Sequence, residues 1–131
     1  MGTLLVVDDN AELCRMLGRF LTRAGHRCLC ANSADEAMTI LKGQIPDLVL
    51  ADVMMPDTSG LDLLRTMRKD DRTREVPVVI FSAVSEERYV NEAMALGADD
   101  YWLKGSLKAG DLETRIRAFL PDHASDHAAV V

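Results

Sequence analysis

The sequence predicts a single α/β domain in which helices cover both faces of a five-stranded parallel sheet. Its 131 residues fit one domain, since domains cluster at about 100–150 residues. Five short apolar runs are near-continuous rather than alternating, which is typical of strands buried on both faces. Helical patterns separate these runs, and such an alternation produces a parallel sheet with right-handed crossovers. The predicted strands are Thr3–Val7, Arg27–Ala31, Asp47–Ala51, Val78–Phe81 and Tyr101–Leu103.

Between the predicted strands, apolar residues recur at the three- and four-residue spacing of a helix face. Each group marks the side of a helix that is expected to pack on the sheet. The groups are Leu13, Leu17, Leu21 and Ala24; Ala37, Ile40 and Leu41; Leu61, Leu64 and Met67, which outline a third helix together with the charged Arg68; Tyr89, Ala93 and Leu96; and Leu112, Ile116, Phe119 and Leu120.

Local signals predict where several of these helices begin and end. Gly25 and Gly97 follow the first and fourth helices, where glycine commonly ends a helix. Ser33 and Glu36 have the spacing of a capping box at the start of the second helix. Ser85 is the predicted N-cap of the fourth.

The pattern stops after Leu120, so the sequence predicts a domain over residues 1–120 and a flexible C-terminal tail over 121–131. Composition narrows the function. A net charge of −6 argues against direct nucleic-acid binding, which needs clustered Lys and Arg. No apolar run is long enough to span a membrane or to form a signal peptide. We therefore expect a cytoplasmic protein, with Cys14, Cys28 and Cys30 as buried structural thiols.

Charged and polar residues stand at the ends of four of the predicted strands. Asp8 and Asp9 follow the first strand, Asp52 the third, Ser82 the fourth and Lys104 the fifth. Each alone could be a cap, a turn residue or a solvated side chain. However, ligands of open α/β sheets bind beyond the carboxyl ends of the strands. The five side chains are therefore expected to form one site.

The charges of this site predict a metal ion. Two carboxylates about 4 Å apart repel by about 4 kcal/mol at an effective dielectric constant of about 20, and Lys104 supplies only one positive charge. A hard divalent cation fits best, and Mg²⁺ binds one or two carboxylates together with phosphate oxygens and water. Since an Asp carboxylate can accept a phosphoryl group, the site suggests phosphoryl transfer to an aspartate.

Four motifs carry a family resemblance that runs from about Thr3 to Leu120. Their order, spacing and strand placement resemble those of response-regulator receiver domains of two-component signalling, which have the CheY-like strand order 2-1-3-4-5. The motifs are Val7-Asp8-Asp9-Asn10, Leu50-Ala51-Asp52-Val53-Met54-Met55-Pro56, Phe81-Ser82-Ala83 and Gly97-Ala98-Asp99-Asp100-Tyr101-Trp102-Leu103-Lys104.

The resemblance assigns roles to the residues of the site. Asp52 is implied to accept the phosphoryl group, with Mg²⁺ bound directly by Asp9, by Asp52 and by the backbone carbonyl of Met54. Asp8 is implied to bind the metal through water. Lys104 is implied to pair with the phosphoryl group, while Ser82 turns toward it and Tyr101 turns inward in step. Most receivers have Pro after this Lys, often with a cis bond, whereas this chain has Gly105.

The resemblance also implies partners and a signalling role rather than a conventional enzyme. The phosphoryl donor is a sensor histidine kinase, a histidine phosphotransfer protein or a small phosphodonor, and the domain promotes its own phosphorylation and dephosphorylation. The output is a downstream protein or a self-dimer, bound through the face of the fourth helix, fifth strand and fifth helix.

Three other interpretations compete with that of a working receiver domain. A phosphatase of the haloacid-dehalogenase type needs its nucleophile on the first strand, with a second Asp two residues later, where this chain has Met54. A nucleotide- or flavin-binding domain needs a Gly-rich turn after the first strand, and Asp8 and Asp9 would repel phosphate there. A degenerate receiver would act only as a protein-interaction module, although the acceptor, metal and switch residues are all present.

Overall fold

The computed structural model describes residues 2–55 and 58–120. Five strands alternate with five helices along this part of the chain. The tail predicted over 121–131 lies outside the described residues, and its boundary at residue 120 stays a prediction. In chain order the elements are β1 (Thr3–Val7), α1 (Ala11–Arg23), β2 (Arg27–Ala31), α2 (Ala34–Gly43), β3 (Leu48–Ala51), α3 (Gly60–Lys69), β4 (Val78–Ser82), α4 (Glu87–Ala95), β5 (Asp100–Leu103) and α5 (Ala109–Arg117).

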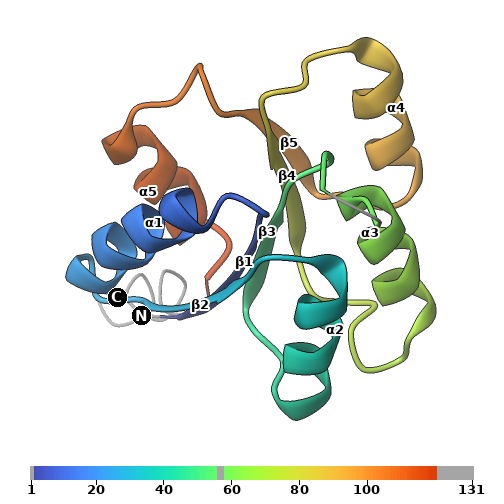
Figure 1. The fold of residues 1–131 in the computed structure, drawn as a ribbon, viewed down its shortest axis with the longest axis horizontal. Coiled ribbons are helices and arrows are strands. Elements are labelled where there is room, and N and C mark those ends of the chain that lie inside the picture. The colour runs from blue at the N-terminus through green and yellow to red at the C-terminus, as the bar shows by residue number, and fades with distance from the viewer. Residues whose placement is uncertain (1, 56–57, 121–131) are drawn as a thin grey trace, which may run out of the picture.

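The sheet has the strand order β2-β1-β3-β4-β5, and every neighbouring pair is parallel. This confirms the predicted α/β class and strand order. The sheet separates two layers of helices, with α1 and α5 on one side and α2, α3 and α4 on the other (Figure 1). All five strands therefore end on the same side of the domain, which we call the carboxyl end of the sheet.

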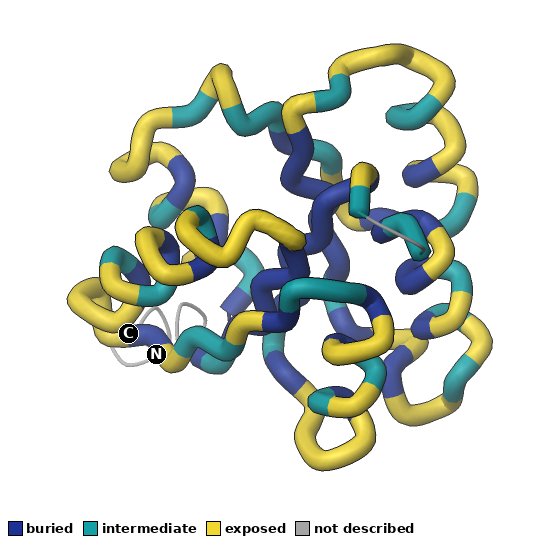
Figure 2. Tube along the Cα trace, viewed as in Figure 1, coloured by how far each residue is buried: buried dark blue, intermediate teal, exposed yellow. Residues whose placement is uncertain are grey.

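The core consists of two apolar clusters on opposite faces of the sheet, because successive strand residues point to opposite faces. In β1, Leu5 and Val7 belong to the cluster beneath α2, α3 and α4, whereas Leu4 and Val6 belong to the one beneath α1 and α5. Figure 2 shows the buried segments gathered in the central strands and the exposed ones on the outer helical turns and loops.

Both predicted helix-ending glycines adopt the backbone conformation that glycine tolerates best. Gly25 has a φ of 95° and Gly97 a φ of 99°, in the region where a Cβ atom causes strain. Asn10 caps α1 by accepting a hydrogen bond from Leu13 N at 3.1 Å.

Two predicted helix starts were wrong in detail. The N-cap of α4 is Glu86, which makes no side-chain capping bond, and Ser85 lies outside the helix. Ser33 does cap α2 by accepting from Glu36 N at 3.1 Å, but the Glu36 carboxylate accepts from Asn32 N instead of from Ser33 N. A complete capping box instead starts α3, where Ser59 and Asp62 bond reciprocally.

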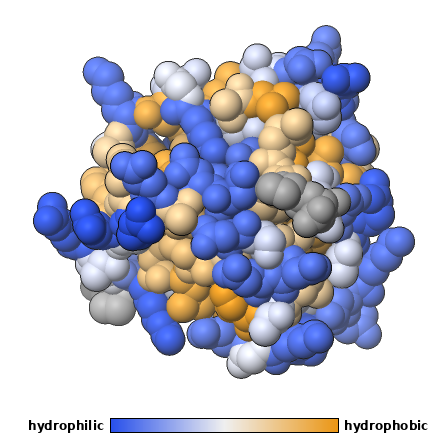
Figure 3. Space-filling model, in the orientation of Figure 1, coloured by the Kyte–Doolittle hydropathy of each residue, from blue (hydrophilic) through white to orange (hydrophobic). Residues whose placement is uncertain are grey.

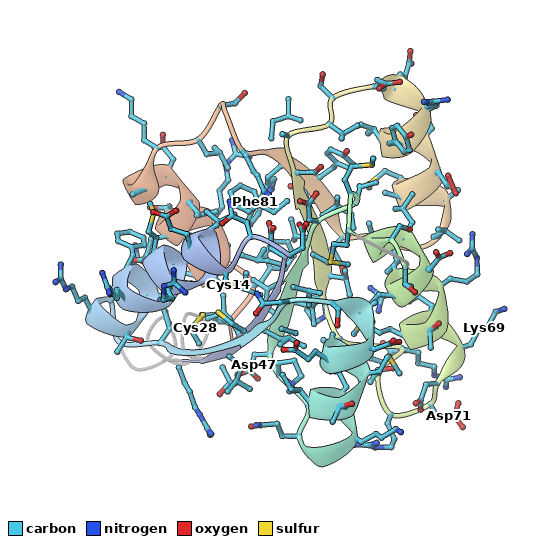
Figure 4. The ribbon with its side chains drawn as sticks, in the orientation of Figure 1. Cys14, Cys28, Asp47, Lys69, Asp71 and Phe81 are labelled. Carbon is cyan, nitrogen blue, oxygen red and sulfur yellow. The ribbon has the colours of Figure 1, made fainter. Side chains whose placement is uncertain are left out.

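At the amino end of the sheet, where the strands begin, two aspartates extend the hydrogen bonding between strands. Asp47 N donates to Thr3 O, and the Asp47 carboxylate accepts from Thr3 N at 2.9 Å. Asp99 repeats this arrangement with Val78, whose N–H it accepts at 2.8 Å, and also pairs with Arg68 at 3.2 Å. Asp47 thus bonds like a strand residue, although β3 itself begins at Leu48 and not at the predicted Asp47. Figure 4 labels Asp47 at the end of the sheet.

The prediction of three buried thiols was correct only for Cys14. Cys28 is half-buried and Cys30 is exposed, because β2 is an edge strand that α1 covers only in part. No helix of the described residues is long and apolar enough to cross a membrane. In the view of Figure 3, hydrophilic side chains cover most of the surface and apolar ones show in separate patches.

Candidate functional site

Three carboxylates meet at the carboxyl end of the sheet, as the sequence predicted. One oxygen each of Asp8, Asp9 and Asp52 lies within 4.8 Å of the others. Asp8 and Asp52 are only 2% and 7% exposed, whereas Asp9 is exposed. The two buried carboxylates follow β1 and β3, which are neighbours in the sheet although Asp52 comes 44 positions after Asp8 in the chain. We refer to these three residues as the acidic cluster.

Lys104 provides a positive charge next to the acidic cluster. It follows β5, and its Nζ donates to Asp8 Oδ2 at 2.5 Å and to Asp52 Oδ2 at 2.9 Å. Burial acts to lower the pKa of Lys104, but the hydrogen bonds and negative charges of Asp8 and Asp52 outweigh it. The pKa of Lys104 is therefore raised, and its side chain stays protonated.

Backbone groups hold the two buried carboxylates in place. Asp8 Oδ1 accepts from Asn10 N at 3.0 Å, and Asp52 Oδ1 accepts from Met54 N at 3.2 Å. In both residues the other oxygen, Oδ2, is the one that faces Lys104. Each carboxylate is thereby oriented by the loop that follows its own strand.

Gly60 and Asn32 also support the site, although the sequence motifs did not identify them. A Cβ atom on Gly60 would lie 2.0 Å from Asp52 O, so only glycine allows α3 to begin this close to the backbone of Asp52. Asn32 Nδ2 donates to Asp8 O at 3.0 Å. The signal for Gly60 is its place directly after the N-cap Ser59, and Asn32 follows the end of β2.

The predicted switch residues lie beside the acidic cluster and are connected through Val84. Ser82, with no exposed surface, accepts from Val84 N at 3.1 Å, while the Tyr101 hydroxyl donates to Val84 O at 2.6 Å. Burial raises the pKa of Tyr101, so the hydroxyl stays protonated. The switch roles that the resemblance implied for Ser82 and Tyr101 stay predictions.

Gly105 does not prevent Lys104 from reaching the acidic cluster. Ser106 N donates to Leu103 O at 3.1 Å, which closes a turn around Lys104 and Gly105, and Lys104 N donates to Ser82 O at 3.0 Å. The described residues contain no cis peptide bond. The position of Lys104 thus follows from β5 and this turn, without the proline that most receivers have.

The donor set of the acidic cluster fits a hard divalent cation. Three carboxylates and one ammonium leave an excess of negative charge in a partly buried place, and carboxylate oxygens are the ligands that Mg²⁺ prefers. With a cation bound, Asp52 would carry a nucleophilic oxygen next to Lys104. Such an arrangement can stabilise the negative charge of a phosphoryl group.

Comparison with known proteins gives one consistent family. Residues 4–117 match the family model described as the response regulator receiver domain. The phosphate regulon transcriptional regulatory protein PhoB of Pseudomonas aeruginosa is 36% identical over 118 residues, which cover 90% of this chain and 51% of that protein. The transcriptional regulatory protein CpxR of Klebsiella pneumoniae is 37% identical, covering 92% of this chain and 50% of that protein. The chain thus spans about half the length of these relatives.

Solved structures agree in fold over nearly the whole chain. The chemotaxis protein CheY4 of Vibrio cholerae superposes with a TM-score of 0.85, at 22% identity, over 92% of this chain and 99% of that one. A response regulator receiver protein of Pseudomonas putida has a TM-score of 0.83 at 32% identity, covering 88% of this chain and 95% of that one.

Proposed function

Because the chain belongs to the response regulator receiver domain family, we propose that it accepts a phosphoryl group on Asp52 and signals through the resulting change in shape. Receiver domains are phosphoacceptor signalling domains of two-component systems rather than conventional enzymes. The observation that supports this assignment best is the convergence of Asp8, Asp9, Asp52 and Lys104 at one edge of the sheet.

The proposed reaction moves a phosphoryl group from a phosphohistidine or a small phosphodonor to Asp52. Asp52 Oδ2 attacks the phosphorus atom as the bond to the donor breaks, and Lys104, which now contacts Asp52 Oδ2, pairs with a phosphoryl oxygen. Ser82 donates to another phosphoryl oxygen after leaving Val84 N. The transfer needs no separate nucleophile, since a carboxylate oxygen can itself attack phosphorus.

Receiver domains bind Mg²⁺ at an acidic pocket, and the acidic cluster is the corresponding place in this chain. We assign direct coordination to Asp9, Asp52 and the backbone carbonyl of Met54, with Asp8 acting through a water molecule. The bound ion would supply positive charge for the phosphoryl oxygens. The exposed position of Asp9 leaves this side of the cluster open to solvent and donor.

The test is phosphorylation by acetyl phosphate in the presence of Mg²⁺, followed by intact-mass measurement. Wild-type protein should gain one phosphoryl group, and Asp52→Asn should gain none, because an amide is not a competent nucleophile here. Asp47→Asn is the matched control, since it removes a carboxylate that bonds Thr3 N at the opposite edge. Uptake by Asp52→Asn at the wild-type rate would contradict the assignment, and failure of the wild type to be labelled would favour a degenerate receiver.

The proposed output is the surface formed by α4, β5 and α5. A phosphoryl group adds about −1.5 to −2 charges and three acceptor oxygens, so it would draw the Ser82 hydroxyl toward itself as a donor and away from Val84 N, from which Ser82 now accepts. Since Val84 also accepts the Tyr101 hydrogen bond, movement at Ser82 would reach β5. Binding of beryllofluoride, a phosphoryl mimic, should shift amide resonances near Ser82, over 85–96 and over 101–105. Shifts confined to the neighbours of Asp52 would argue for an uncoupled phosphate acceptor.

The partners follow from this assignment. We expect a sensor histidine kinase or a histidine phosphotransfer protein as donor, and a downstream protein or a second copy of the chain as target, in the cytoplasm. The curated relatives are named as transcriptional regulators and are about twice as long. Direct contact with nucleic acid is not expected for the residues of this chain, whose net charge is −6.

A further inference from the structure

Three thiols gather between α1 and β2, away from the acidic cluster. Cys14 of α1 is 2% exposed, Cys28 of β2 is half-buried and Cys30 of β2 is exposed. Figure 4 shows Cys14 and Cys28 in the space between this helix and this strand. Cys30 Sγ lies 3.4 Å from Cys14 O, so the exposed thiol leans over α1. We call these three residues the thiol cluster.

The thiol cluster lines a shallow groove of about 510 Å³, a volume within the range of small-molecule sites. Gly18 of α1 also lines it. A Cβ atom at this position would meet nothing within 4 Å, so packing does not require glycine here, and glycine in a helix costs about 1 kcal/mol relative to alanine. The missing side chain keeps the groove open next to the thiols.

Three arginines form one wall of this groove. Arg15, Arg19 and Arg23 lie four residues apart on α1 and are exposed, so they form one stripe of like charge. Within the described part of the chain, none of them forms an ion pair, whereas Arg65, Arg68 and Arg117 do. The groove is therefore locally positive on a protein of net charge −6, and it suits an anionic ligand.

Cys30 is the thiol most suited to react. Hydrogen bonding with the Cys14 and Cys28 thiols lowers the pKa of Cys30 and outweighs burial, which acts to raise it. The hydrogen bond with Cys30 and burial both raise the pKa of Cys28. Exposure points to the same residue, since a reactive thiol must be accessible to its partner.

We propose that Cys30 is a modification site that forms a mixed disulfide with a small anionic disulfide, which the stripe of Arg15, Arg19 and Arg23 recognises through its carboxylates. Cys30 first loses its proton to solvent. The thiolate then attacks one sulfur of the disulfide, a new S–S bond forms as the old one breaks, and the released thiolate takes up a proton. The small disulfide is the oxidant, so no other redox partner is required.

The site is tested by treating the full chain with oxidised glutathione, which carries carboxylates, and mapping the adduct by peptide mass spectrometry. Cys30 should be modified first, and Cys30→Ser should lose this reaction. First modification at Cys14 or Cys28, or the absence of an adduct on Cys30, would overturn the proposal. Labelling of Asp52 by acetyl phosphate is measured separately, so the two proposals can fail independently.

Recognition by the arginines is tested with the double variant Arg15→Gln/Arg19→Gln. It should react about threefold to tenfold more slowly with oxidised glutathione, as expected for two exposed charge contacts. Its rate with the uncharged hydroxyethyl disulfide should stay at the wild-type value. Arg27→Gln is the matched control, because Arg27 is exposed on β2 but does not line the groove. Equal slowing with both reagents, or none with glutathione, would overturn anion recognition.

Discussion

The two ends of the sheet use aspartate in opposite ways. At the amino end, Asp47 and Asp99 each accept a backbone N–H from the neighbouring strand, and Asp99 has Arg68 as an additional partner. At the carboxyl end, three carboxylates crowd together, and Asp8 and Asp52 share the single ammonium of Lys104.

The carboxylates at the amino end stabilise the fold, whereas those at the carboxyl end form the proposed binding site. A carboxylate with its own donors stabilises the native state, because a satisfied charge-assisted hydrogen bond contributes about 1.5–3 kcal/mol. Crowded carboxylates repel one another, so they cost stability until a cation or a phosphoryl group changes the charge balance. Neutralising substitutions should therefore have opposite signs at the two ends.

Gly60→Ala should have the largest effect on stability, because its new side chain overlaps backbone atoms at the carboxyl end. The substitution changes no charge. The new Cβ would lie 2.0 Å from Asp52 O, and relieving such an overlap costs roughly 3 kcal/mol. Urea unfolding gives the change in free energy of unfolding. Gly43→Ala is the control, since a Cβ there meets nothing within 4 Å. A Gly60→Ala protein as stable as the control would show that the backbone at Asp52 can move aside.

Asp99→Ala should destabilise the protein by about 2 kcal/mol, since Val78 N loses its acceptor and Arg68 loses its carboxylate partner, although it keeps its backbone acceptors. Asp99→Asn keeps an acceptor oxygen but loses the charge, so about half that loss is expected. Both values come from the same urea experiment. Loss of equal size in the two variants would mean that the charge, rather than the hydrogen bond to Val78 N, carries the stabilisation.

Magnesium should stabilise the native state through the carboxyl end alone, where the acidic cluster would bind it. At ten times its dissociation constant, a ligand that binds the native state alone adds about 1.4 kcal/mol. Thermal unfolding with and without Mg²⁺ should show this gain in the wild type and in Asp99→Asn, and a much smaller gain in Asp9→Ala. An undiminished gain in Asp9→Ala would remove Asp9 from the set of direct ligands.

Asp9→Asn should show the smallest effect, with a sign opposite to that of Asp99→Asn. Without Mg²⁺ it should stabilise the protein by about 1 kcal/mol or less, because Asp9 is exposed and solvent screens its repulsion. Urea unfolding in the presence of a chelator measures this change. A destabilised Asp9→Asn would show that Asp9 supports the fold as Asp99 does, and the contrast between the two ends would fail.

The sequence by itself determined the alternation of strands and helices and the place of the site. Near-continuous apolar runs such as Leu48–Ala51 show burial on both faces, and parallel strands end at one edge, so Asp8, Asp52 and Lys104 had to meet. Both statements depend on local periodicity and on chain direction, which can be followed along one dimension. The strand order came from the resemblance of the motifs, not from the periodicity.

Only the tertiary structure decided what each residue meets across the fold. The partner of Asp99 is Val78, 21 residues away, and Gly60 is needed because α3 starts against Asp52 O. Cys30 is exposed because β2 lies at the edge of the sheet, although its apolar surroundings in the sequence indicated burial. Such contacts depend on which strands become neighbours and how closely a helix approaches, and no local pattern of residues encodes that distance.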